Sequence, residues 1–437
     1  MKRDLPRIAA PLASLLLLAG LTVQAQTGGS TRPRRVRQTP KTETSSANKS
    51  PDTLLDVEPA NANTSSGSSR RRNTSASTTN SDTPLLTPVA STPVAAPVSS
   101  GSADTSHAFS LLQGKQYAEA LKEARQITLS NPDDSEGWKI AGFAEMNLKQ
   151  YAEAAADLQK ALDLQRAARQ EDPFTSDALA HAYFLSDNFE RALPLLVAAT
   201  TRKDTKPEAV TIYYRAVAEY RTGKTAEAER TFNSIIKGNP KDAAALYFLG
   251  QIAYERKDLD AAISTLNRAT LADPRTVSAW NLLTVAYLQR AASAATPAAA
   301  DADYLNAVRA GEGLTRVKTD AGANMLFAQA LIGAKQYARA ATVLERFTLG
   351  ADADPSTLYL LGVAQSRAQN YPKAISALER AAAKTPDDVN IYRELGYAYE
   401  ISKQYVKALA AYEKGARLAP NDADFKESVE RVRPFAK

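Results

Sequence analysis

The hexapeptide KQYAEA occurs twice in this chain of 437 residues, and the spacing of its copies constrains the fold more than any other feature. The two copies start at residues 115 and 149, which are 34 residues apart. Looser copies, KQYARA and KQYVKA, start at 335 and 403, a separation of 68, or twice 34. A fixed period in this range is typical of repeat proteins. The chain is therefore expected to use one small structural unit many times.

The clearest unit runs from 243 to 276. Apolar residues recur at intervals of three and four around 246–256 and 259–271, which predicts two amphipathic helices. A proline at 274 ends the second helix, because the residue before a proline disfavours helical geometry. The unit is thus a helical hairpin. The same frame recurs at 355–388 and 389–422, with Gly362 and Gly396, Ala374 and Ala408, and Pro386 and Pro420 in equivalent positions.

This frame resembles the tetratricopeptide repeat family. The positions that carry the resemblance in the clearest unit are Leu246, Leu249, Gly250, Tyr254, Ala262, Leu266, Ala269 and Pro274. The resemblance implies an all-α fold, a right-handed superhelical α-solenoid of about nine helix-turn-helix repeats between 106 and 422. No single hairpin can bury its own apolar face, so neighbours must stack. Residues 423–437, with apolar Phe425, Val429 and Val432, are expected to form a capping helix.

Three irregularities interrupt the frame. Extra residues after Leu162 predict a longer second helix there, and Pro194 is expected to kink a helix. The tract at 288–303 is an insertion between two paired helices. Such insertions form loops or extended helices on one face, and a neutral role is favoured over a functional one.

The N-terminal 25 residues have the layout of a secretory signal peptide. Basic residues precede an apolar run at 8–23, and small residues at Val23 and Ala25 suit cleavage after Ala25. An uncleaved anchor is the alternative, but the run is broken by Pro11 and is short for a span of roughly 20 residues. Residues 26–105 are rich in Ser, Thr, Pro and Asn, which predicts a disordered linker.

The surplus positive charge lies in the N-terminal quarter of the chain. Residues 1–105 hold 12 Lys and Arg against 7 Asp and Glu, which leaves 42 against 41 in the rest of the 54 and 48. A nucleic-acid-binding domain is disfavoured, because neutralising phosphates needs a clustered basic face. Two basic runs of the linker could contact an anionic lipid or wall polymer, although a solubilising role is the simpler interpretation. Their arginines include Arg34, Arg35, Arg70, Arg71 and Arg72.

No catalytic constellation is recognisable. Cysteine is absent, and the two histidines, His107 and His181, lie 74 residues apart. No zinc-protease, nucleophile-elbow or phosphate-loop motif is present. Each histidine is more readily explained as a packing or surface residue. No enzyme activity, cofactor or metal is expected.

The resemblance implies that the first helix of each hairpin lines a concave groove in which peptides or partner segments bind. Members that bind acidic chaperone tails use a clamp of Lys, Asn, Asn, Lys and Arg, which does not appear in order here. Tyrosines dominate instead, which suggests an apolar or extended ligand. Any one of these rings could equally pack between repeats. The candidate groove residues are Phe143, Met146, Phe184, Tyr213, Tyr220, Tyr247, Tyr254, Tyr359, Arg393 and Tyr397, with His181, Val217, Gln251, Asn281 and Val285 beside them.

Two functional hypotheses follow from the sequence. The first is an exported, non-enzymatic scaffold that binds protein or peptide partners in the periplasm or cell envelope of a bacterium. The alternative is a structural envelope protein whose basic linker binds an anionic polymer while the repeats act as a spacer.

Overall fold

A computed structural model describes residues 103–203 and 205–437. Within these residues every regular element is helical, and the fold is an all-α solenoid. The expected signal peptide at 1–25, the linker residues 26–102 and the basic runs of the linker lie outside the described residues. The first described helix begins at Ala103 rather than at 106, and Thr105 is already buried.

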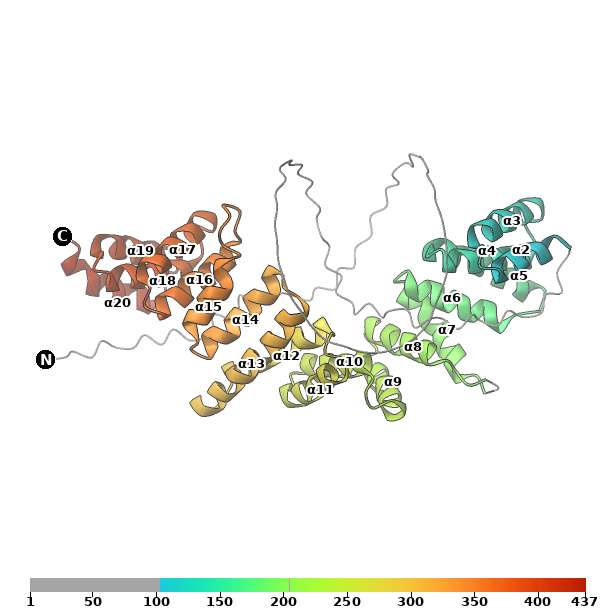
Figure 1. Cartoon of the computed structure of the whole chain (residues 1–437), viewed down its shortest axis with the longest axis horizontal. Helices are drawn as coiled ribbons and strands as arrows, with labels where there is room; N and C mark the ends of the chain where they lie inside the picture. The colour runs from blue at the N-terminus through green and yellow to red at the C-terminus, as the bar shows by residue number, and fades with distance from the viewer. Residues whose placement is uncertain (1–102, 204) are drawn as a thin grey trace, which may run out of the picture. The chain divides into compact units, whose positions relative to one another are not determined.

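In the described part of the chain, α2 to α19 pair into nine hairpins, each formed by two consecutive helices that contact each other. Figure 1 shows the hairpins following one another in chain order. The first helices are α2 (Ala103–Gln113), α4 (Ser135–Asn147), α6 (Pro173–Leu185), α8 (Ala209–Arg221), α10 (Ala243–Glu255), α12 (Val277–Ala292), α14 (Ala321–Gly333), α16 (Pro355–Arg367) and α18 (Val389–Ile401). The second helices are α3 (Tyr117–Ser130), α5 (Tyr151–Ala167), α7 (Phe189–Thr201), α9 (Thr225–Gly238), α11 (Leu259–Ala272), α13 (Pro297–Val317), α15 (Tyr337–Glu345), α17 (Tyr371–Lys384) and α19 (Tyr405–Leu418).

The hexapeptide KQYAEA forms the turn inside a hairpin. Lys149 adopts a left-handed backbone conformation with φ of 61°. The N–H of Lys149 donates to the carbonyl of Met146, and the N–H of Gln150 donates to that of Glu145. This is the Schellman arrangement that ends a helix by satisfying its last carbonyls. Tyr151 is then the first residue of α5.

Aspartates cap the start of most first helices, and several of them come two residues after a repeat proline. Asp134 accepts hydrogen bonds from the backbone N–H groups of Glu136 and Gly137, at 3.0 and 3.1 Å. An N-cap of this kind satisfies donors that have no partner inside the helix. The aspartates that cap a helix in this way at the start of a first helix or of α20 are Asp134, Asp172, Asp242, Asp320, Asp354, Asp388 and Asp422.

Small residues stand where the paired helices cross. A Cβ on Gly142 would lie 2.5 Å from Leu158, and one on Gly250 would lie 2.6 Å from Leu266. Larger residues there would push the helices apart. The alanine four residues into a second helix is fully buried in eight hairpins. These are Ala120, Ala154, Ala192, Ala228, Ala262, Ala340, Ala374 and Ala408.

The core is a series of clusters rather than one centre. Buried residues of α2 to α4 form one cluster and those of α5 to α8 form the next. Two more lie over α8 to α10 and over α10 to α13, and the largest runs from α12 to α20. Each hairpin therefore depends on its immediate neighbours for burial, as expected for stacked repeats.

The insertion at 288–303 is helical. It lengthens α12 and the start of α13, and Thr296 caps α13 ahead of Pro297. Arg290 binds Asp303 across the hairpin at 2.6 and 2.9 Å, and Lys335 binds Asp301 at 2.9 Å. The two possibilities left by the sequence, loop or extended helix, are thus resolved in favour of extended helices.

The other irregular positions also keep helical geometry. The second helix that contains Leu162 is long, since α5 has 17 residues where α9 has 14. Pro194 lies inside α7, which continues to Thr201.

The chain ends with α20 (Ala423–Val432) and a short 3-10 helix at Arg433–Phe435. Phe425 is 1% exposed and lies against Gly415 of α19. Arg431 of α20 donates to Glu400 of α18 at 2.9 and 3.1 Å. Through these contacts α20 covers the last hairpin.

Candidate partner-binding surface

Neighbouring hairpins are closest on the side of their first helices. Consecutive first helices contact each other from α2 to α8 and from α10 to α18, whereas consecutive second helices make at most marginal contacts. We call the side chains at the fifth, ninth and twelfth residues of the first helices, with their aromatic neighbours, the first-helix face. This is the surface to which the sequence assigned a groove.

An aromatic group lies between α6 and α8 on this face. The ring of Phe184 stacks on that of Tyr214, with centroids 4.0 Å apart and planes at 15°. Phe189 meets Phe184 edge to face at 5.5 Å, and His181 meets Tyr214 edge to face at 5.1 Å. Such pairs stabilise beyond the area they bury.

A second group gathers around Phe248 of α10. Phe248 is 2% exposed and stacks on Phe232 at 5.0 Å. Tyr213, Tyr220 and Tyr247 surround it edge to face at 6.3, 5.5 and 5.3 Å. These three tyrosines are half-buried, so part of each ring stays accessible. Three candidate residues from α8 and α10 are thereby brought together on one buried ring.

The polar tips on this surface are neutral at physiological pH. Burial raises the pKa of the Tyr213 hydroxyl and that of Tyr220, whose hydroxyl donates to Glu255. Burial lowers the pKa of His181 to about 4, and its Nε2 lies 3.0 Å from Thr211 Oγ1. The rings of this surface thus carry uncharged polar groups, with the Glu255 carboxylate beside Tyr220.

Other candidates extend the surface at both ends. Phe143 and Met146 of α4 are half-buried and pack against the cluster that contains Phe184. Tyr254 of α10 is half-buried against the cluster shared by α10 and α12. The remaining positions differ in access: Val217 is buried, Gln251 and Val285 are half-buried, and Asn281 is exposed.

The three C-terminal candidates are not part of this surface. Tyr359 is only 5% exposed, because α14 and α16 are buried on the first-helix face as well. Arg393 pairs with Asp422 and Asp424 and lies 4.5 Å over the ring of Phe425. Its role is to hold α20 in place. The expectation that Tyr359 and Arg393 line an open groove is corrected accordingly.

Tyr397 is half-buried and lies against a charged pair rather than against the aromatic groups. Arg367 lies 5.6 Å from the Tyr397 ring and binds Glu394 at 2.8 and 3.1 Å. The aromatic part of the open first-helix face therefore runs from α4 to α10.

Sequence reasoning missed Tyr214 and Phe248, the rings on which the two groups are built. Each directly follows a tyrosine in the sequence, in the pairs Tyr213-Tyr214 and Tyr247-Phe248. Two adjacent aromatic residues in one first helix were the available signal, because one faces the surface and the other the neighbouring hairpin.

Residues 103–203 and 205–437 hold no group of three or more His, Asp or Glu side chains arranged to bind a metal ion. Among the same residues, no helix is both long enough and apolar enough to cross a membrane.

A family model described as tetratricopeptide repeat matches the chain at residues 107–173, 215–276 and 359–423. No curated protein matches it. Among solved structures, the chain is similar to a tetratricopeptide repeat protein from Parabacteroides merdae, with 14% identity, a TM-score of 0.38, and 60% of this chain and 98% of that one covered.

Two further structures are similar over shorter stretches. MamA from Desulfovibrio magneticus shares 22% identity at a TM-score of 0.36, covering 41% of this chain and 97% of its own. YrrB, described as a protein of this repeat type with an unusual peptide-binding site, shares 17% identity at a TM-score of 0.38, covering 46% and 97%.

Proposed function

Because this chain belongs to the tetratricopeptide repeat family, we propose that it is a non-enzymatic scaffold that binds a protein partner along the first-helix face of α4 to α10. Repeats of this type commonly serve as platforms for protein–protein interaction. The observation that carries the proposal is the set of half-buried tyrosines around Phe248.

The chemistry of this surface favours an extended, largely apolar peptide segment. Tyrosine presents a large ring with a polar tip and loses little entropy on binding, which is why it is enriched at interaction hot spots. The neutral His181 and the near balance of charge outside the N-terminal quarter give no preference for a polyanion.

Site-specific photo-crosslinking in the full chain tests this proposal. A photoreactive phenylalanine analogue at Tyr247 or Tyr254 should give adducts with the same partner segment. The same analogue at Tyr117, a half-buried tyrosine at a hairpin turn, should not. Replacing both Tyr247 and Tyr254 by alanine should weaken binding of that partner by about tenfold or more. Equal adducts at Tyr117, or unchanged affinity in the double variant, would contradict the assignment.

We further propose that the scaffold is exported to the periplasm or cell envelope. The basis is the signal-like sequence at 1–25 and the polar, proline-containing linker that follows it. Fractionation of cells producing the chain, with N-terminal sequencing of the mature protein, should give a start at Gln26 in the envelope fraction. A cytoplasmic product that still begins at Met1 would refute export.

The alternative role for the linker rests on where the positive charge lies. Residues 1–105 carry the surplus, and Arg70, Arg71 and Arg72 form a compact basic run. Replacing these three by glutamine separates the hypotheses. If the linker anchors the protein on an anionic polymer, retention in the envelope falls while partner binding persists; if the repeats alone determine location, retention is unchanged.

A further inference from the structure

A polar contact recurs between successive hairpins, away from the first-helix face. It joins the ninth residue of one second helix, the eleventh residue of the following first helix and the third residue of the next second helix. We call this set the second-helix clip. In α15 to α17 it consists of Glu345, Gln365 and Lys373. Gln365 Nε2 donates to Glu345 Oε1 at 3.0 Å, and Lys373 Nζ lies 3.2 Å from the same oxygen.

The same register is used in α17 to α19. Here the Tyr399 hydroxyl donates to Glu379, and Lys407 Nζ lies 5.4 Å from the centre of the Tyr399 ring. In both C-terminal clips a carboxylate therefore accepts from the central residue, and a lysine supplies the opposite charge beside it.

The clip of α5 to α7 lacks the carboxylate. Gln159 takes the place of Glu345 and Glu379, and the Tyr183 hydroxyl donates to its Oε1 at 2.9 Å. The cation is kept, since the guanidinium carbon of Arg191 lies 5.7 Å from the centre of the Tyr183 ring. No ion pair of Arg191 is formed within residues 103–203 and 205–437. The α5 to α7 clip therefore keeps the positively charged side chain but has no carboxylate to balance it.

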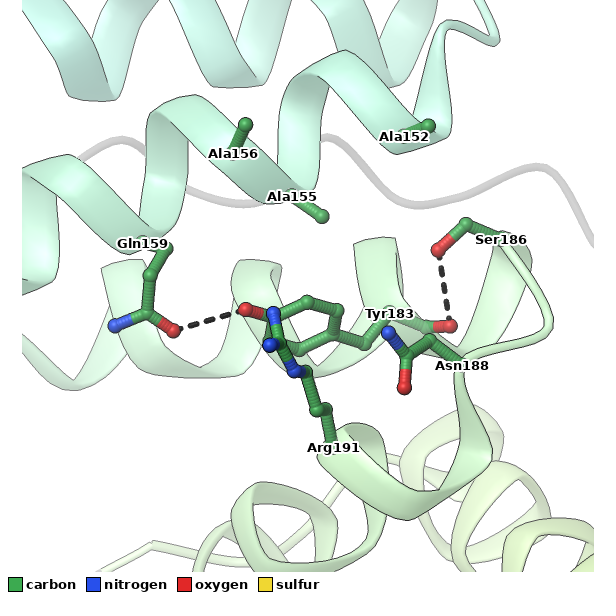
Figure 2. Close-up of a pocket in the computed structure, with 8 residues that line it drawn as sticks. All are labelled: Ala152, Ala155, Ala156, Gln159, Tyr183, Ser186, Asn188 and Arg191. Atoms are coloured by element: carbon green, nitrogen blue, oxygen red, sulfur yellow. Dashed lines mark hydrogen bonds between the residues drawn. The ribbon is translucent and has the colours of Figure 1, made fainter. Parts of the chain in front are cut away.

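Arg191 also borders an open depression of about 340 Å³ between α5 and α7. Figure 2 shows the alanines of α5 on one side, Arg191 on the other and the Tyr183 ring between them. The lining contains no acidic residue; its members are Ala152, Ala155, Ala156, Gln159, Tyr183, Ser186, Asn188 and Arg191.

Small side chains keep this space open. The fifth residue of the helix that starts each clip is Ala155 in α5, Ala341 in α15 and Ile375 in α17, and Ile375 is 8% exposed. The α5 to α7 clip thus differs from the α17 to α19 clip in two ways at once. It has lost a carboxylate, and it has gained room for one supplied by another molecule.

We propose that the depression between α5 and α7 binds a carboxylate presented by an acidic segment of a protein partner. Arg191 provides the charge and a planar set of donors that fits a carboxylate, while the Asn188 amide offers a further donor at the rim. The alanine floor and the Tyr183 ring take the methylene groups of a glutamate or aspartate. A nucleic acid fits less well, since binding successive phosphates needs a row of cations.

The site is separate from the surface proposed above, so the two can be tested independently. The probe is a fluorescein-labelled octapeptide of alternating alanine and glutamate, and its counterpart has glutamine at every glutamate position. Fluorescence anisotropy with the full chain at low ionic strength should show binding of the glutamate peptide only. Replacing Arg191→Gln should weaken that binding by roughly fivefold or more.

The decisive variant is Gln159→Glu, which introduces the carboxylate found in the two C-terminal clips while leaving Arg191 in place. The α11 to α13 hairpins also lack this carboxylate, since Asn267 bonds Tyr287 in this register. The introduced glutamate should pair with the Arg191 guanidinium within the chain. The affinity for the glutamate peptide should therefore fall by a similar factor. Because this variant adds an ion pair to the folded chain, a loss of peptide binding is not explained by a loss of folding. The matched control is Arg230→Gln, which removes an exposed arginine on α9 and should leave binding unchanged.

Three outcomes overturn the proposal. They are equal binding of the glutamine peptide, full binding by the Gln159→Glu variant, and an equal loss in the Arg230→Gln control. The double alanine variant at Tyr247 and Tyr254 should bind the glutamate peptide as the unaltered chain does. A loss there would place the acidic segment on the first-helix face instead.

Discussion

At the scale of single residues, the turn inside most hairpins places a non-glycine residue in a left-handed backbone conformation, where glycine would be expected. Lys149 has φ of 61°, and Lys115, Lys257, Lys335 and Lys403 lie between 60° and 64°. Among residues 103–203 and 205–437, one hairpin turn uses glycine at this position, with Gly223 at φ of 76°. A side chain in this region costs roughly 1 kcal/mol, which the carbonyls satisfied by the Schellman bonds offset.

Replacing Lys149→Gly should therefore raise the free energy of unfolding by up to about 1 kcal/mol, and Lys149→Val should lower it by about 1 to 2 kcal/mol. Urea unfolding measures both. The reverse change at the equivalent position, Gly223→Ala, should destabilise by about 1 kcal/mol. A stabilising Lys149→Val variant would contradict the role assigned to this backbone position.

Glu145 is the most strongly perturbed buried acid between the first hairpins. Arg125 of α3 donates to Glu145 Oε1 at 2.6 Å and lies 2.7 Å from Asp157 Oδ2 of α5. One guanidinium thus faces two buried carboxyls, with Glu153 nearby. Burial, with the Asp157 charge, raises the pKa of Glu145 from 4.5 to about 7.

The pH dependence follows from this direction. The folded chain binds the Glu145 proton more tightly than the unfolded chain, so the stabilisation is complete below about pH 4.5 and is lost as pH rises through about 7. Denaturant titrations at pH 5 to 8 should show the free energy of unfolding falling over this range. In the Glu145→Gln variant the free energy of unfolding should fall less over this range, because glutamine carries no proton to lose. A wild-type chain whose free energy of unfolding falls from pH 5 to 8 by no more than that of the Glu145→Gln variant would refute the account.

At the scale of elements, the hairpin of α12 and α13 shows how an insertion is accommodated. Its extra residues continue both helices, and Arg290 fastens their base to Asp303 and to Asp260 of α11. The side chain of Asp303 is 10% exposed, whereas that of Asp301, which binds Lys335, is 52% exposed. The more buried pair is expected to contribute more to the free energy of unfolding.

The two acids therefore make a matched test. Asp303→Asn leaves a partly buried guanidinium with a weakened partner and should lower the free energy of unfolding by about 1 to 3 kcal/mol. Asp301→Asn removes an exposed pair and should change it by less than about 0.5 kcal/mol. Thermal unfolding of both variants measures the difference. Equal effects would show that the base of the insertion is not braced by Asp303.

The number and type of these elements could be read from the period and the turn signals. About nine repeats were expected and nine hairpins are present in the described residues.

The candidate surface was predicted less well. Tyr213, Tyr220 and Tyr247 converge on one ring, but Tyr359 is buried and Arg393 is paired. All five occupy first-helix positions that look alike in the sequence, so the repeat frame could not separate them.

At the scale of the whole molecule, the solenoid has no central core and depends on its ends. Phe425 and Val432 of α20 are each 1% exposed, and they cover the last hairpin. An uncovered terminal hairpin exposes the apolar face that a further repeat would bury. The C-terminal helix is thus part of the folded unit rather than an appendage.

Ending the chain after Asn421 should destabilise α18 and α19 first. Amide hydrogen exchange in these helices should accelerate by at least about tenfold, while α4 to α10 change little, because coupling in a solenoid is mainly between neighbours. The control ends after Phe435 and keeps α20. Uniform acceleration along the chain in the shorter form would show global rather than nearest-neighbour coupling.

The sequence alone determined the repeat, the helical hairpin and the family, because these depend on local chemistry: alanines and glycines at helix crossings, aspartates at caps, and a turn after each first helix. Tertiary structure decided which equivalent positions remain accessible. Stacking closes the first-helix face over α14 and α16 and leaves it open from α4 to α10. It also places Gln159 and Arg191, 32 residues apart, on either side of one depression. Access and pairing are set by how neighbouring hairpins meet, and no single repeat contains that information.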